Sequence, residues 1–356
     1  MNKGPANTYS ALERFQDAIK GQPEDHVPIF PMIAAWAAVN FSDSPPARLA
    51  GDPQRVVEAQ IRAMEAVGYD AFYAYANPLY IPQAFGCNVR FLETGPLADP
   101  LPLSITSMDD LDKLPIPDPV QSEPLAEALR IVQGLSRYGA GKIPVLGLFE
   151  GPITTTCRIF ETELIMRMIY KNPQLLEALL DRVTAFLIDF SRALVDNGAN
   201  VIFLPEPTAS TALISPVTFR KFVLPRLQAI TRKLEVPCML HICGDTSPVL
   251  KDIGRAGADV ISLDQCMNLA ESRSTVPDAV LGGNVDPINA LLIGSREQIA
   301  EDTLNCLQTA GTRHFVLMSG CGVPPGAPPA NVKAMVEAAK AYGLGSTKLN
   351  HEANQH

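Results

Sequence analysis

The sequence predicts an α/β protein of the (β/α)8 TIM barrel class, and two observations carry this prediction. Short β-rich runs alternate with helix-like stretches eight times along the chain. Several of the runs are almost continuously apolar, as expected for parallel strands with both faces buried. The length of 356 residues exceeds that of most domains but is ordinary for a barrel folded as one unit. The runner-up is a doubly wound open sheet, which usually has fewer strands.

The predicted strands and helices follow one another without an internal repeat beyond this alternation. Helical patterns with apolar residues on one face occupy 53–68, 172–199 and 295–311, among others. The predicted strands are 27–33, 71–76, 143–151, 200–207, 237–244, 259–265, 279–286 and 314–322.

Two segments interrupt the rhythm. Residues 86–120 are rich in Pro and Asp, and we interpret them as an insertion between the second and third strand–helix units. Residues 344–356 are polar, and we expect them to form a disordered tail. The prediction is therefore one barrel domain over 1–343.

Composition and charge exclude several classes of protein. The chain carries 29 Lys and Arg against 38 Asp and Glu, for a formal net charge of -9, so the basic footprint of a nucleic-acid-binding protein is missing. The first residues lack the apolar core of a signal peptide, and no apolar run reaches the length of a membrane span. We expect a cytoplasmic protein. Its seven cysteines have no short-spaced framework, so they should be thiols, and a special one would be a ligand or a nucleophile.

The segment LHICG, residues 240–244, places a histidine and a cysteine two residues apart at the end of the fifth predicted strand. On a strand, side chains at i and i+2 point to the same face, so His241 and Cys243 should face the same way. Barrel active sites lie at this end of the strands. Cys321, in SGCGVPPG, ends the eighth predicted strand and would reach the same rim.

One nitrogen and two sulfur donors suit Zn²⁺, and three protein ligands leave a fourth position open, as in catalytic zinc sites. The alternative is that His-x-Cys arises by chance and that these cysteines are small core residues.

Polar residues also stand at the ends of other predicted strands. Asn77, Glu206, Asp264 and Asn284 are candidate cofactor-binding residues, and Glu150 lies at a similar place. The alternative is that some of them only cap the helices that follow.

Large aromatic residues occur near the same predicted rim. Tyr73, Tyr75 and Tyr80 are candidates for pocket walls or for the core. The single tryptophan, Trp36, follows the first predicted strand and would line the mouth or pack inside.

Nearly the whole chain resembles the uroporphyrinogen decarboxylase superfamily, whose fold is a (β/α)8 barrel. The resemblance lies in 10–31, 107–119, 257–265, 281–287 and 320–343. Within the superfamily, the branch of methylcobalamin:coenzyme M methyltransferases binds a catalytic zinc through His-x-Cys and a distant Cys. Those positions match His241, Cys243 and Cys321, inside LHICGDTSPVL and SGCGVPP.

The resemblance implies a reaction and its partners. The expected activity is methyl transfer from a methylated corrinoid, either methylcobalamin or a separate corrinoid protein, to a small thiol such as coenzyme M. A zinc-bound thiolate would attack the methyl group on Co(III) and release Co(I). Backbone amides near Thr246 are one option for holding a sulfonate. Glu206 or Asp264 would orient a ligand or bind the zinc themselves.

Three alternatives remain open at this point. Methyl transfer could run from a methylated or methoxylated substrate to Co(I), or could use another acceptor. Decarboxylation of a porphyrinogen is disfavoured, because the decarboxylases carry an arginine-rich stretch where this chain has PMIAAWAAVNF, and an aspartate where it has Asn77. A non-catalytic corrinoid-binding protein is the least favoured, since it would have no reason to keep the His/Cys/Cys set.

Overall fold

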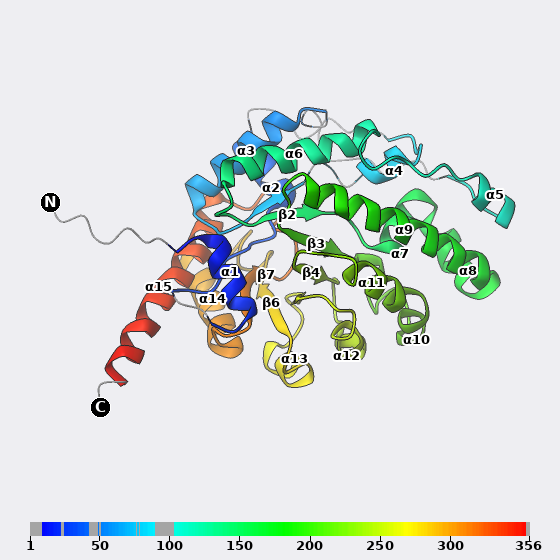
Figure 1. The fold of residues 1–356 in the computed structure, drawn as a ribbon. Coiled ribbons are helices and arrows are strands. Elements are labelled where there is room, and N and C mark those ends of the chain that lie inside the picture. Colours follow the sequence, from blue (N-terminus) through cyan, green and yellow to red (C-terminus); the bar gives the residue numbers. More distant parts are fainter. Residues whose placement is uncertain are drawn as a thin grey trace.

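Seven parallel strands form one sheet in the sequence order β1 to β7, and helices surround it (Figure 1). The computed structural model describes residues 9–22, 25–42, 49, 51–75, 77, 79–89 and 103–353. Each strand pairs with the next one along the chain. The strands are β1 (Phe72–Ala74), β2 (Val145–Leu148), β3 (Val201–Pro205), β4 (Cys238–His241), β5 (Val260–Ser262), β6 (Val280–Val285) and β7 (Phe315–Ser319).

The first predicted strand, 27–33, closes the circle without forming a regular strand, so the expectation of eight regular strands is corrected to seven. Ile29 makes an isolated parallel bridge with Leu317 on β7, and its carbonyl accepts from the amide of Asp70, just before β1. Pro28 and Pro31 have no N–H to donate, which prevents a continuous ladder here. The segment still joins β7 to β1, so the architecture is the predicted (β/α)8 barrel.

Most helices lie outside the strands, and their ends follow from local sequence. Ser10 and Ser295 each form a capping box at the start of a helix, and Gly68 ends another with a left-handed φ of 86°. The helices before β3 are α1 (Ala11–Ile19), α2 (Ala34–Phe41), α3 (Pro53–Val67), α4 (Tyr80–Ala84), α5 (Met108–Lys113), α6 (Glu123–Gly139), α7 (Pro152–Ile159), α8 (Thr162–Lys171) and α9 (Pro173–Asp196). Those after β3 are α10 (Pro216–Thr218), α11 (Leu224–Thr231), α12 (Leu250–Ile253), α13 (Leu269–Thr275), α14 (Arg296–Ala310) and α15 (Pro329–Ala353).

The structure gives different outcomes for the two predicted irregular segments, 86–120 and 344–356. Part of the predicted insertion, 90–102, lies outside the described residues, and the part after it contains α5, which begins at a capping box on Ser107. The predicted disordered tail is wrong for 344–353, because α15 continues to Ala353; residues 354–356 lie outside the described part. Polar composition alone does not prevent a helix, and this segment also contains helix formers such as Leu, Lys and Ala.

A buried ionic cluster stabilises the join between the first segment and β1. The Arg14 guanidinium on α1 pairs with Asp25 at 2.6 Å and with Asp70 at 3.0 Å, and the other carboxylate oxygen of Asp70 accepts from the amide of Ile29 at 2.9 Å. The core as a whole is apolar. Within the described part of the chain, no helix combines the length and the apolar character needed to cross a membrane.

Candidate metal centre and cavity

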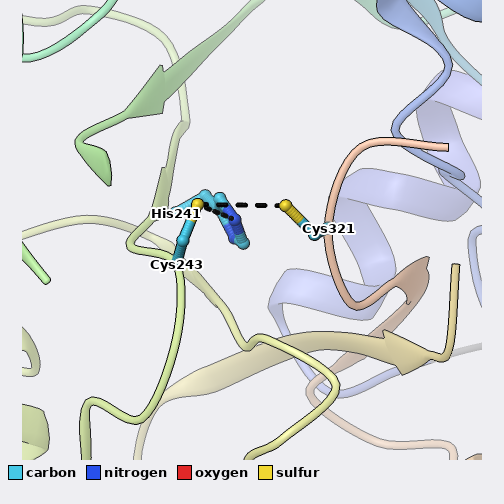
Figure 2. Close-up of side chains that lie close together, drawn as sticks. All are labelled: His241, Cys243 and Cys321. Atoms are coloured by element: carbon cyan, nitrogen blue, oxygen red, sulfur yellow. Dashed lines mark hydrogen bonds between the residues drawn. The ribbon is translucent and has the colours of Figure 1, made fainter. Parts of the chain in front are cut away.

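Three donor side chains meet at the carboxyl ends of the strands (Figure 2). His241 is the last residue of β4, Cys243 follows two residues later, and Cys321 lies on the loop after β7. Cys243 Sγ lies 3.4 Å from His241 Nε2 and 3.8 Å from Cys321 Sγ, and the three donor atoms all lie within 4.8 Å of one another. The structure therefore brings together the three residues that the sequence singled out.

The spacing of these donors matches the requirements of a zinc ion. Around a tetrahedral Zn²⁺ with Zn–S of about 2.3 Å and Zn–N of about 2.0 Å, two sulfur ligands lie about 3.8 Å apart, and a sulfur and a nitrogen about 3.5 Å apart. The observed separations are 3.8 and 3.4 Å. The donor chemistry and these two separations fit the ion, and the third pair, His241 Nε2 and Cys321 Sγ, lies within 4.8 Å.

Ser262 fixes the orientation of His241 and was not identified from the sequence. The two residues are register partners on β5 and β4, and Ser262 Oγ lies 3.1 Å from His241 Nδ1. That contact leaves Nε2 directed at the cysteines. The available signal was a lone polar residue inside the apolar run DVISL, at the same level as His241.

The two cysteine thiols share their charge unequally. The hydrogen bond from Cys243 and the neighbouring His241 lower the pKa of Cys321 to about 4. The same contact with Cys321, together with burial, raises the pKa of Cys243. Both shifts favour a negative charge on Cys321 over one on Cys243, and a thiolate is the form that binds a metal.

Asp264 and Asn284 hold the loops next to the cluster. The Asp264 carboxylate accepts from the amides of Gly244 at 2.8 Å and Cys266 at 3.1 Å. The Asn284 side-chain amide donates to the carbonyls of Asp264 and Met267. These contacts fix the loop after Cys243, and neither side chain lines the cavity described below. Their binding role stays a prediction.

Glu206 and Asn77 also have internal partners. The Glu206 carboxylate is fully buried and accepts from the amides of Ile153 at 3.2 Å and Thr154 at 2.7 Å, at the start of α7. Burial raises its pKa to about 7, against the effect of these hydrogen bonds. Gly151 leaves room for this carboxylate, which a Cβ at that position would overlap. Asn77 Oδ1 accepts from the amide of Leu79. In this structure Glu206 accepts from the first amides of α7, and Asn77 makes a local turn contact just before α4.

The predicted sulfonate site near Thr246 is not available, because its amides are already bonded. The amide of Thr246 contacts Met267 Sδ at 3.2 Å, and that of Ser247 donates to Asp245 Oδ1 at 2.9 Å. The helix that begins here, at Ser247–Val249, is a single 3-10 turn.

A cavity of about 340 Å³ opens beside the three donors, a size typical of small-molecule sites. Tyr73, Tyr75 and Tyr80 line it, which confirms that they are pocket walls, while Trp36 is packed inside with its indole N–H donating to the carbonyl of Ala327. The described residues lining the cavity are Met32, Tyr73, Tyr75, Tyr80, Ile81, Pro82, Leu148, Phe149, Glu150, Thr155, Arg158, Phe203, Pro205, Pro207, His241, Cys243, Cys321 and Gly322.

An ion pair forms part of this wall. Arg158 Nε and Nη2, on α7, each lie 3.1 Å from an oxygen of Glu150, which follows β2. The sequence analysis noted Glu150 at a strand end but missed Arg158, whose position in the last turn of α7 gave no signal of its own.

The chain matches the family model described as "Uroporphyrinogen decarboxylase (URO-D)" over residues 10–342. Methylcobamide:CoM methyltransferase MtbA from Methanosarcina mazei is 27% identical over 94% of this chain and 98% of its own length. Uroporphyrinogen decarboxylase from Geobacter metallireducens is 28% identical over 91% of this chain and 97% of its own.

A solved structure described as a methyltransferase from Methanosarcina mazei superposes with a TM-score of 0.83 at 27% identity, covering 94% of this chain and 99% of that one. Methyltransferases occur among the relatives in both the sequence and the structure comparison, and the predicted methyltransferase activity is confirmed at this level. On sequence, fold and site together, the chain belongs to the uroporphyrinogen decarboxylase family.

Proposed function

We propose that this protein transfers a methyl group between a corrinoid and a small sulfur compound, with zinc held by His241, Cys243 and Cys321. The observation that carries the proposal is the convergence of one nitrogen and two sulfurs within 4.8 Å of one another, with the two separations at Cys243, 3.4 and 3.8 Å, close to those around a tetrahedral zinc ion. The methyltransferases among the relatives support the reaction class.

Zinc in such a site supplies an open coordination position at which a substrate thiol loses its proton near neutral pH. The chain's own residues prepare that position. Ser262 orients the His241 ring, and Asp264 anchors the amide of Gly244, next to Cys243. The cavity walls exclude water from the substrate, so charge that develops during the transfer meets fixed groups and little solvent.

The proposed direction is from a methylated corrinoid to a thiol. A separate corrinoid protein, or free methylcobalamin, would present the methyl group at the carboxyl ends of the strands, where the cavity opens beside the donors. The reverse direction, from a methylated sulfur compound to Co(I), uses the same residues. An assay run both ways decides between them.

Porphyrinogen decarboxylation remains the second candidate, since decarboxylases are among the relatives. The described cavity is poorly matched to that substrate. A porphyrinogen carries many carboxylates, whereas α2 (Ala34–Phe41), which follows the bridging segment 27–33, contains no arginine, and Arg158 is already paired with Glu150.

The test begins with zinc content and continues with turnover. We expect about one zinc per chain after purification without chelators. Mixed without oxygen with methylcobalamin and a panel of thiols, the protein should cause a thiol-dependent loss of the methyl–cobalt absorption. Zinc with no demethylation, but with methylation of Co(I) by a thioether, would reverse the direction. A chain without zinc, or one that decarboxylates uroporphyrinogen, would contradict the proposal.

A further inference from the structure

Aromatic rings form a continuous wall between the cavity and the donor cluster. Tyr73 contacts Phe203 edge to face, with ring centroids 5.5 Å apart, and Phe203 stacks on the His241 ring at 6.4 Å with an interplanar angle of 22°. All three rings line the cavity. A substrate whose sulfur approaches the donors therefore has its body against aromatic faces.

Two of the three tyrosines that line the cavity, Tyr73 and Tyr80, offer their rings and not free hydroxyl groups. Tyr73 donates its hydroxyl to the carbonyl of Phe30 at 3.1 Å, and Tyr80 donates to the carbonyl of Leu148 at 2.5 Å. Both hydroxyls are therefore occupied. Together with Met32, Leu148 and the other apolar lining residues, these rings make the wall predominantly apolar.

The charged part of the wall is neutralised. Among the described lining residues outside the donor cluster, Glu150 and Arg158 are the charged ones, and they form a two-point ion pair. An anionic substrate would have to compete with the Glu150 carboxylate for Arg158, and would lie near a negative charge that stays behind. The amides near Thr246, which could have taken a sulfonate, are bonded internally.

We propose that the cavity selects a sulfur compound with an uncharged aromatic body, and that it discriminates against a short thiol with an anionic tail. This inference rests on the proposed function, whose thiol it specifies. Burial of a ring against Tyr73 and Phe203 favours the first class. Desolvation of a sulfonate without a free cation disfavours the second.

Binding of the methylated products separates this question from turnover. The probes are benzyl methyl sulfide and 2-(methylthio)ethanesulfonate, titrated into the purified zinc-containing protein by calorimetry. We expect the aromatic sulfide to bind at least about tenfold more tightly, because the sulfonate pays an unpaired burial cost. Equal or tighter binding of the sulfonate would overturn the inference, and so would absence of binding by both.

The ion pair supplies a specific variant. Glu150→Gln keeps the size of the side chain but leaves the Arg158 charge uncompensated beside the cavity. We expect sulfonate binding to tighten about tenfold, and binding of the aromatic sulfide to change less than about threefold. Glu163→Gln is the matched control, since it breaks an exposed Glu–Arg pair on α8, with N–O distance 3.6 Å, and should change neither affinity. An unchanged sulfonate affinity in Glu150→Gln would count against the role of the pair. The wild-type comparison stands even if the variant folds poorly.

Failure of the inference differs visibly from failure of the proposed function. If zinc is present and methylcobalamin is demethylated, but 2-mercaptoethanesulfonate gives a kcat/KM equal to or above that of phenylmethanethiol, the function holds and the substrate class is wrong. If neither thiol supports methyl transfer in either direction, the function itself is wrong.

Discussion

Cys243 is the residue that contacts both other donors, so its removal should dismantle the centre. Cys243→Ala leaves one nitrogen and one sulfur, too few to hold zinc tightly. We expect zinc per chain to fall close to zero and methyl transfer to disappear, while the fold is kept. Metal analysis and the corrinoid assay measure both.

Cys266→Ala is the control for this change. Cys266 is exposed on the loop after β5 and is not part of the donor set. Its loss should leave zinc and turnover intact. A Cys243→Ala protein that retained a full zinc complement would show that the ion lies elsewhere.

Ser262 should act on zinc through His241. In Ser262→Ala the imidazole loses its contact at Nδ1, so the ring can rotate and present Nε2 less well. We expect zinc affinity to fall about 10- to 100-fold, and Ser262→Thr to recover part of it. Chelator competition measures the affinity. Ser274→Ala, which removes an exposed hydroxyl on α13 bonded to the carbonyl of Ala270, should have no effect.

At this scale, the sequence predicts what short-range periodicity controls. The two-residue spacing predicts that His241 and Cys243 face the same way, although β4 ends at His241 and Cys243 lies just beyond it. Cys321 follows from the rule that barrel strands end on one rim. Ser262 and Arg158 could not be predicted in this way. Ser262 contacts His241 because the two residues are paired on neighbouring strands, and Arg158 contacts Glu150 because α7 starts where it does. Neither the strand register nor the start of the helix can be determined from the sequence alone.

At the scale of single elements, α7 depends on Glu206. This carboxylate caps the amides of Ile153 and Thr154, and the helix then carries Thr155 and Arg158 into the cavity wall. In Glu206→Ala two buried amides lose their acceptor, which should reduce the free energy of unfolding by about 1–3 kcal/mol. Urea denaturation measures the loss.

Glu161→Ala is the matched control at the next helix. Glu161 precedes α8, is exposed and makes no side-chain cap. Its removal should change stability by less than about 0.5 kcal/mol. Equal stability of both variants would mean that Glu206 is not a structural cap, and would return it to the list of ligand candidates.

At the scale of the whole molecule, Asp70 joins the first and second segments of the barrel. Asp70→Ala removes the acceptor of the Ile29 amide and one partner of the buried Arg14 guanidinium. We expect a loss of about 3–5 kcal/mol in the free energy of unfolding, measured with urea. Asp189→Ala breaks an exposed pair with Arg192 and should cost less than about 1 kcal/mol. A loss below that for Asp70→Ala would mean that closure does not depend on this carboxylate.

The barrel as a whole was predictable because its strands are apolar runs of regular spacing. The first segment was the exception, since VPIFPMI has the composition of a strand, while Pro28 and Pro31 limit it to a bridge. The end of the last helix was missed because the polar composition of 344–356 was interpreted as a disordered tail, whereas the chain continues as helix to Ala353. Residues such as proline and glycine mark where a strand or helix can end, and the packing around the segment decides where it does end.

The three proposed zinc ligands lie far apart in the sequence, so they are synthesised at different times. Cys321 lies 78 residues after Cys243, on the loop that follows the last strand. Synthesis must therefore continue past β7 before Cys321, the third ligand, is present. A chain that ends before this point offers at most two donors. At the proposed zinc site, metal acquisition would for this reason be a late event, and tight zinc retention would mark a chain whose translation has passed β7.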